Sequence, residues 1–387
     1  MLRRLNAEPD LSVTALFQSD ISVRGYVDPG FGVRVDWDVP LLEGYPYKFL
    51  PAVGGVDKLG FWRPWNYGLA GELRRGKYDA IWIHGYGHAY HLYAMLIARL
   101  MGLKVLLRDE AHNRSRVRGA LDRLLAAIVY RYMSWTVTGF LAIGTANRQR
   151  CLDMGIRPEA IHLVPYAVDN GFFGVASLEE KTAAKAEVCR TLGVEPGRPI
   201  VLFAAKLQPR KRCSDLIRAF SREGVWNHPS RPLLIIAGDG EEMGACRELA
   251  REVPDESSIR FIGFQNQTRL VQLYRAADIF ALTSDAEPWG LTINEAMSAG
   301  CAILASDEIG SVLDLVPHGV NGFTCAAGDI DAQAQHLRAM LDDPAKVRKM
   351  GEESLRLISG WGFEQDVLGL RQALGLPDRP PSGDATP

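Results

Sequence analysis

Short apolar runs alternate with stretches of helical periodicity along most of the sequence, and this alternation limits the folds open to the chain. Strands that alternate with helices form βαβ units, whose strands are parallel and lie between layers of helices. We therefore predict an α/β fold with parallel sheets. The strands are expected at 12–17, 80–84, 104–107, 140–143, 161–164, 200–204, 233–237, 259–262, 279–283, 302–305 and 322–324. The helices are expected at 89–101, 117–133, 213–221, 243–252, 267–276, 291–299 and 332–341.

The 387 residues are enough for two domains, each with its own core. We predict a first domain at 1–170, a linker with a short helix at 171–198 and a second domain at 199–360. A closing helix is expected at 361–375, and the Pro-rich, polar tail at 376–387 is expected to be disordered.

The chain opens on Leu2-Arg3-Arg4-Leu5, which is typical of the end of a helix. A doubly wound domain normally opens with a strand and a loop before its first helix. We therefore expect that the first strand of the N-terminal domain is missing, through a truncated start. A naturally abbreviated domain is the alternative.

Composition excludes several classes of protein. A net charge of −2 gives the whole chain no bias toward nucleic acid or anionic membranes. The six cysteines are scattered without a Cys-x-x-Cys pair, which favours reduced thiols in a cytoplasmic protein. No run of apolar residues is long enough for a transmembrane helix, and no signal peptide is visible.

Residues 284–301 carry the strongest functional signal. Glu287 and Glu295 stand eight residues apart, on either side of Gly290 and the start of a predicted helix. A glycine loop that runs into a helix N-terminus offers free backbone N–H groups and a positive dipole end to an anion. The two carboxylates can accept hydrogen bonds from hydroxyl groups. A sugar nucleotide, in which a diphosphate joins two polyhydroxyl rings, fits such a site.

Further candidates follow strands of the predicted second sheet. Lys206 and Lys211 follow the strand at 200–204, at the edge of the sheet where ligands bind and where they can neutralise a diphosphate. Gly263 and Phe264 follow another strand, and the exposed backbone there can contact a nucleobase.

Together these motifs resemble the family 4 retaining glycosyltransferases, which have the GT-B fold of two facing Rossmann-like domains. The resemblance is strong over residues 140–375 and looser over 12–140. It implies that Lys206 and Lys211 contact the donor diphosphate, although relatives usually have Arg at the first position.

The resemblance also implies roles around the predicted helix. Glu287 would bind a hydroxyl of the transferred sugar, and Glu295 would bind the ribose diol. Backbone N–H groups of Trp289, Gly290 and Leu291 would hold phosphate and sugar oxygens. We expect Gly263 and Phe264 to bind the donor as well, and the catalytic residues to be Lys206, Lys211 and Glu287.

The implied reaction is sugar transfer from a nucleotide-diphosphate sugar, with retention, to a glycan, lipid-linked or small-molecule acceptor, as in polysaccharide biosynthesis. It requires no metal and no cofactor beyond the nucleotide sugar as co-substrate. The triplets Asp36-Trp37-Asp38 and Asp329-Ile330-Asp331 match a metal-binding pattern of another fold and are interpreted as chance matches. The alternatives are a sugar-nucleotide 2-epimerase of the same fold and a catalytically inactive sugar-nucleotide-binding protein.

The acceptor side is expected in the first domain. Arg108, Asp109 and Glu110 follow the strand at 104–107, with His112 behind them, and His84 ends the strand at 80–84.

The helix expected at 117–133 has apolar residues on one face and arginines around the rest. We favour a helix packed on the sheet with a solvated basic face. Peripheral contact with the inner membrane surface is the alternative.

Overall fold

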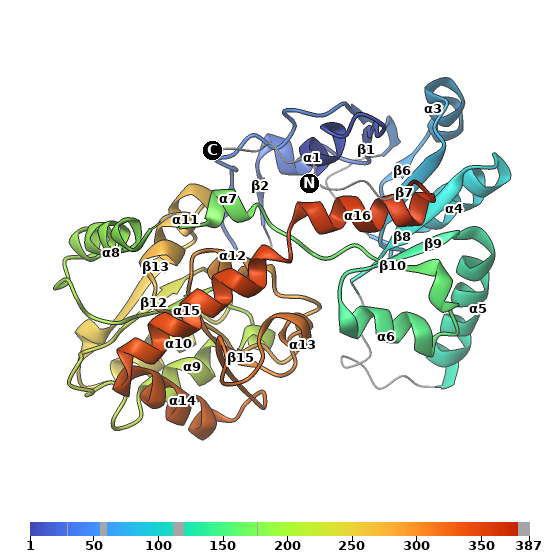
Figure 1. The fold of residues 1–387 in the computed structure, drawn as a ribbon. Helices are drawn as coiled ribbons and strands as arrows, with labels where there is room; N and C mark the ends of the chain where they lie inside the picture. Colours follow the sequence, from blue (N-terminus) through green and yellow to red (C-terminus); the bar gives the residue numbers. More distant parts are fainter. Residues whose placement is uncertain (29, 55–59, 111–119, 176, 378–387) are drawn as a thin grey trace. The chain divides into compact units, whose positions relative to one another are not determined.

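The computed structural model describes residues 1–28, 30–54, 60–110, 120–175 and 177–377. The chain divides into two compact units, and each contains a parallel sheet with helices (Figure 1). Unit 1 comprises Met1–Arg24, Pro40–Tyr166 and Phe363–Pro387, and unit 2 comprises Gly25–Val39 and Ala167–Gly362.

Unit 2 is built on a six-stranded parallel sheet with the strand order β13-β12-β11-β14-β15-β16. The strands are β11 (Ile200–Ala204), β12 (Leu233–Ala237), β13 (Ile259–Gly263), β14 (Ile279–Leu282), β15 (Ala302–Ser306) and β16 (Gly322–Cys325). Every residue of β11, β12, β14 and β15 is buried, as expected of strands that are covered on both faces. The strand order reverses between β11 and β14, and ligands of such sheets bind at this switch point.

The helices of unit 2 pack on this sheet, and α9, α10 and α14 share one apolar core with it. They are α7 (Asn170–Phe173), α8 (Leu178–Leu192), α9 (Cys213–Phe220), α10 (Met243–Arg251), α11 (Gln267–Ala276), α12 (Leu291–Ser298), α13 (Val312–Leu315), α14 (Ile330–Asp342) and α15 (Pro344–Ser359), with short 3-10 turns η3 (Pro209–Lys211) and η4 (Glu256–Ser258).

Unit 2 also contains a hairpin from the first part of the sequence. Strands β2 (Tyr26–Val27) and β3 (Arg34–Val35) pair antiparallel within the segment 25–39, which we call the hairpin segment. From the sequence, this segment was placed in the first domain, at 1–170. Its contacts in the structure place it in unit 2 instead.

Unit 1 contains a four-stranded parallel sheet with the order β10-β9-β8-β7 and two strand pairs, parallel β1-β4 and antiparallel β5-β6. The strands are β1 (Ala15–Phe17), β4 (Tyr47–Phe49), β5 (Ala52–Val53), β6 (Trp65–Asn66), β7 (Ala80–His84), β8 (Lys104–Arg108), β9 (Gly139–Ala142) and β10 (Ile161–Leu163). The helices are α1 (Leu2–Asn6), α2 (Ile21–Arg24), α3 (Leu69–Gly76), α4 (Ala89–Leu100), α5 (Ala120–Thr136), α6 (Thr145–Asp153), the 3-10 turn η2 (Pro158–Ala160) and α16 (Phe363–Leu374).

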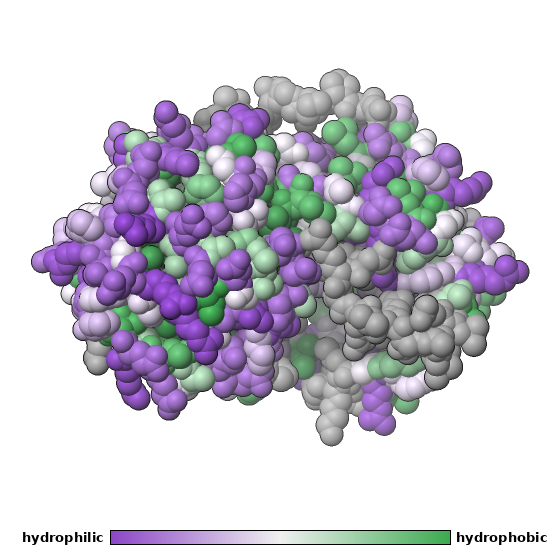
Figure 2. Space-filling model, turned by 90° about the horizontal axis from the view of Figure 1, so that it is seen from below, coloured by the Kyte–Doolittle hydropathy of each residue, from purple (hydrophilic) through white to green (hydrophobic). Residues whose placement is uncertain are grey.

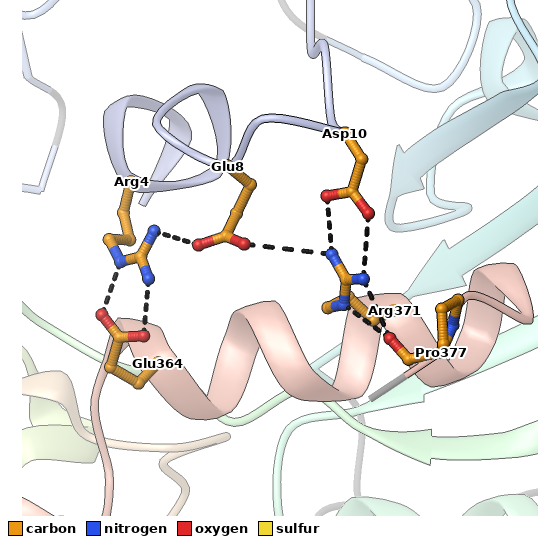
Figure 3. A network of polar contacts seen from close by, with 6 residues as sticks. All are labelled: Arg4, Glu8, Asp10, Glu364, Arg371 and Pro377. Atoms are coloured by element: carbon orange, nitrogen blue, oxygen red, sulfur yellow. Dashed lines mark hydrogen bonds and ion pairs between the residues drawn. The ribbon is translucent and has the colours of Figure 1, made fainter. Parts of the chain in front are cut away.

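Helix α16 returns to unit 1 and is held there by the polar network drawn in Figure 3. Arg371 is 1% exposed and donates to both carboxylate oxygens of Asp10 at 2.8 and 2.9 Å, and also to the Pro377 carbonyl. Arg4 of α1 donates to both oxygens of Glu364 at 2.5 and 2.7 Å. The network therefore fastens the last helix to the first residues of the chain.

The observed strands agree best with the expected ones where the sequence has an uninterrupted apolar run. The strands at 80–84, 200–204 and 233–237 have the predicted bounds, whereas the strand expected at 12–17 is shortened to β1. The expected linker contains the 15-residue helix α8, which Ser177 caps at its N-terminus and Gly193 ends in a left-handed conformation. Helices α2, α3, α6, α13 and α15 and the short strands β2 to β6 were not predicted. Residues 378–387, within the tail expected to be disordered, lie outside the described residues.

Hydrophilic residues cover much of the face drawn in Figure 2, and hydrophobic residues appear there in scattered groups. Among the residues that the structure describes, no helix has the length and hydropathy needed to span a bilayer.

Candidate functional site

The candidate site lies at the switch point of the unit 2 sheet, between the loops that follow β11 and β14. The first loop carries Lys206 and runs through η3, where Lys211 lies, into α9. The second carries Glu287 and runs into α12. Because both strands are parallel, both loops leave the same edge of the sheet. Lys211 and Glu287, which are 76 positions apart in the sequence, thus meet at one place.

Lys211 and Glu287 form a direct ion pair across the switch point. The Lys211 ammonium donates to Glu287 Oε2, and Arg210 Nη1 lies 3.3 Å from the same oxygen. Burial lowers the pKa of Lys211, and the Glu287 charge opposes this effect without cancelling it. The backbone of Glu287 is fixed as well, since its carbonyl accepts from Gly310 N at 3.0 Å. A cation and a carboxylate are thus held side by side at the switch point.

Lys206 has a partner that the sequence did not predict. Its ammonium donates to Asp28 Oδ1 at 2.7 Å and to Oδ2 at 2.9 Å, and it lies 4.8 Å from the ring centroid of Phe31. Both residues belong to the hairpin segment. The Asp-Pro-Gly-Phe stretch signals a turn, but a turn signal says nothing about the surface that the turn contacts.

The turn before α12 is fixed by Trp289 and Gly290. The Trp289 side chain is 3% exposed, donates to Asn294 Oδ1 at 2.9 Å and stacks on Trp361, so its contribution to a ligand is limited to its backbone. Gly290 has φ of 88° and precedes Leu291, the first residue of the helix. The first N–H groups of a helix have no partner within it, so this end presents donors to an anion.

Glu295 lies further along α12 and faces α11. Its Oε2 accepts from the Tyr274 hydroxyl at 2.7 Å, and Tyr274 is fully buried. Burial raises the pKa of Glu295 to about 7, and the hydrogen bond from Tyr274 only partly opposes this shift. The carboxyl group therefore changes its charge close to neutral pH.

Gly263 and Phe264 lie at the same edge of the sheet, on the side away from β14. Gly263 ends β13 with φ of 68°, and its carbonyl accepts from Gly238 N at 2.8 Å. The ring of Phe264 meets Phe31 edge-on, with centroids 4.8 Å apart. The predicted donor residues thus lie on the loops at one edge of the unit 2 sheet and on α12, which starts at that edge, with Glu295 in the middle of this helix.

The predicted acceptor residues lie in unit 1 and differ in their exposure. Arg108 is 4% exposed, donates to the Pro165 carbonyl at 2.7 Å and packs against Tyr166, so it has little surface for an acceptor to contact. Asp109 accepts from Asn147 Nδ2 at 2.9 Å.

Two acceptor candidates remain exposed at the ends of their strands. Glu110 is exposed and accepts from the Tyr166 hydroxyl, and His84 is exposed and stacks on Trp82. His112 lies outside the described residues.

The two aspartate triplets are engaged in protein contacts. Asp36 pairs with Arg34 at 2.7 Å, and Asp38 accepts from Thr268 N at 3.2 Å. Asp329 caps α14, and Asp331 pairs with Arg222 at 2.8 Å. Within the described ranges, no group of three or more His, Cys, Asp or Glu residues is gathered as a metal would require.

The helix considered for membrane contact is α5. Its residue Met133 is fully buried, and Tyr132 donates to the Leu92 carbonyl of α4 at 2.6 Å. Ile128 and Trp135 are 58% and 54% exposed. Residues 111–119, which include three of the arginines expected on its basic face, lie outside the described residues.

Comparisons with known proteins agree with this geometry. Residues 185–356 match the family model of Glycosyl transferases group 1. Over 200 residues the chain is 33% identical to a D-inositol 3-phosphate glycosyltransferase from Nocardia farcinica, and the match covers 50% of this chain and 43% of that protein. The chain thus spans less than half the length of this curated relative.

Solved structures share the fold over most of the chain. HepE from Anabaena in complex with UDP has a TM-score of 0.67 at 20% identity, and 86% of this chain and 85% of that chain are covered. Sucrose-phosphate synthase from Thermosynechococcus elongatus has a TM-score of 0.65 at 17% identity, with 87% and 84% covered. These similarities show that the fold is GT-B.

Proposed function

We propose that this chain, whose residues 185–356 belong to the group 1 glycosyl transferases, transfers a sugar from a nucleotide-diphosphate sugar to a sugar-containing acceptor with retention of configuration. One observation carries the proposal: the Lys211–Glu287 pair lies at the switch point, directly before a helix N-terminus. A diphosphate placed there meets a cation and backbone donors, and its sugar meets a carboxylate.

The same groups suit the chemistry of transfer. The departing nucleotide gains negative charge as the glycosidic bond breaks, and positioned cations and N–H groups stabilise such charge most effectively. We assign this task to Lys206, Lys211 and the first turn of α12. Glu287 binds a hydroxyl of the transferred sugar, and Glu295 binds the ribose diol.

The donor is proposed to be a UDP-sugar, because HepE has been solved with UDP and with UDP-glucose. The acceptor is proposed to bind at the strand ends of unit 1 that carry His84 and Glu110. We place the protein in the cytoplasm. The alternative of peripheral contact through α5 is tested by co-sedimentation with anionic vesicles at low salt, and a lack of binding excludes it.

A donor panel tests the function. The protein is incubated with UDP-, GDP- and ADP-sugars, with and without a mixture of sugar acceptors, and the release of nucleoside diphosphate is measured. Acceptor-dependent release supports transfer. Epimerised sugar without release identifies a 2-epimerase, and binding without turnover identifies an inactive binding protein.

Lys211→Gln is the matched variant. It should reduce turnover at least about a hundredfold, the scale for loss of one charge-stabilising group. Arg222→Gln is the control, because Arg222 follows the C-terminal end of α9, whereas Lys211 precedes its N-terminal end, and Arg222 pairs with Asp331 and not with a residue of the candidate site. Equal activity of both variants and the wild type would exclude Lys211 from the site.

A further inference from the structure

The hairpin segment lies directly on the edge of the sheet that carries the candidate donor site. A Cβ atom at Gly30 would come within 2.8 Å of Lys206 Cδ, and one at Gly240 within 3.0 Å of the Gly30 carbonyl oxygen. Asn266 Nδ2 donates to the Asp36 carbonyl at 2.5 Å. The segment thus contacts the loops after β11, β12 and β13. None of these contacts involves the loop after β14, which carries Glu287.

Asp28 is the charged group that this segment brings to the site. It is 7% exposed, and its Oδ1 accepts from the backbone N–H groups of Gly30 and Phe31 at 2.8 and 3.1 Å. The Tyr26 hydroxyl donates to Oδ2 at 3.0 Å, and Lys206 donates to both oxygens. A carboxylate with this many donors is a fixed part of the site, and burial alone does not neutralise it, because these bonds lower its pKa.

The pair changes what Lys206 can offer to a ligand. Lys206 keeps a third of its side chain exposed, but its charge is balanced by Asp28. An anion that approaches Lys206 therefore also approaches a fixed negative charge. The resulting repulsion grows with the charge of the anion.

The two anions of a transfer reaction differ in charge. In a sugar nucleotide each of the two phosphates has one ester bond and one anhydride bond, so each ionises once. In a free nucleoside diphosphate the terminal phosphate has lost its ester to the sugar and gains a second ionisation near pH 6. The product thus carries about one more negative charge than the donor above pH 7. A fixed carboxylate next to the phosphate site weakens product binding more than donor binding.

We propose that Asp28 tunes the donor site, through its ion pair with Lys206, so that the nucleoside diphosphate product is bound less tightly relative to the donor than an unpaired lysine would bind it. The inference rests on the proposed function, since it requires the diphosphate to bind beside Lys206. It assigns a role in product release to a residue of the first part of the sequence.

Calorimetry with UDP and UDP-glucose at about pH 8 tests the inference. Asp28→Asn keeps an acceptor for the Gly30 and Phe31 amides but removes the charge. It should tighten UDP about tenfold and UDP-glucose about threefold, the scale of one partly screened charge. Product inhibition by UDP should strengthen in parallel. Asp38→Asn is the control, because Asp38 lies on the same segment and contacts Thr268 instead of a lysine.

Lys206→Gln provides the opposite perturbation and does not depend on how well the first variant folds. It leaves Asp28 unbalanced, so it should weaken UDP more than UDP-glucose. If neither variant changes the ratio of the two dissociation constants while the wild-type protein binds both ligands, the inference is wrong and the proposed function stands. If the wild-type protein binds no sugar nucleotide or nucleoside diphosphate in the donor panel, both fail.

Discussion

Replacing Glu295 with Gln should remove a pH-dependent loss of stability from unit 2. In the folded protein, burial raises the pKa of Glu295 from 4.5 to about 7. Between these two values the folded state keeps the proton that the unfolded chain has released. The folded state therefore binds more protons, and the free energy of unfolding falls as the pH rises.

The size of the effect follows from the two pKa values. One pKa unit corresponds to about 1.4 kcal/mol, so raising the pKa from 4.5 to about 7 costs about 3 kcal/mol of stability by pH 8. Gln has no charge to release and still offers an oxygen to the Tyr274 hydroxyl. The variant should therefore match the wild type near pH 4.5 and exceed it by about 3 kcal/mol near pH 8.

Urea unfolding of both proteins at several pH values measures this difference. Asp366 in unit 1 also has its pKa raised to about 7 by burial, so the comparison of variant with wild type is needed to isolate Glu295. A stability difference that does not change between about pH 4.5 and pH 8 would refute the reasoning. Donor binding should change in the opposite direction, because in the proposed function Glu295 binds the ribose diol and only its ionised form is a full acceptor. The wild-type affinity should rise through about pH 7, and the variant should bind weakly at every pH.

Two further substitutions test the fold. Arg371→Met should lower the free energy of unfolding by about 2 kcal/mol, since it removes the charge-assisted hydrogen bonds of a buried guanidinium to Asp10 and the Pro377 carbonyl, whereas Met at Arg356, an exposed residue of a surface pair, should cost less than about 1 kcal/mol. Equal losses would contradict a stabilising role of the Arg371 network. Gly290→Ala should cost about 2 kcal/mol, because φ is 88° and the new Cβ would lie 2.9 Å from an isoleucine methyl group. Gly319→Ala, where φ is 80° and no atom lies within 4 Å, should cost less, and urea unfolding separates conformational strain from contact.

Much of unit 2 could be predicted from the sequence because its signals are local. The strands at 200–204 and 233–237 are uninterrupted apolar runs, and such runs are buried on both faces in a parallel sheet. The turn at Gly290 and the start of α12 could be predicted from residues 284–301, because a glycine before an apolar-periodic stretch marks a helix boundary.

The partners of the site residues could not be predicted, because they are far away in the sequence. Lys206 and Asp28 are 178 positions apart, and Tyr274 and Glu295 are 21 apart on different helices. Arg108 shows the same limit. It ends β8 at the edge of the sheet where ligands bind, which made it a candidate for the acceptor side. Its side chain is buried, because it donates to the Pro165 carbonyl and packs on Tyr166, two residues that follow β10.

The hairpin segment has a consequence for the construction of chimeras. The chain passes between the two units at Arg24, Val39, Tyr166 and Gly362, so a single junction in the middle of the sequence does not separate them. A hybrid that takes only 167–362 from this protein would pair Lys206 with whatever residue the recipient supplies in place of Asp28. A chimera designed to exchange donor preference should therefore take two segments from the same parent, residues 25–39 and residues 167–362.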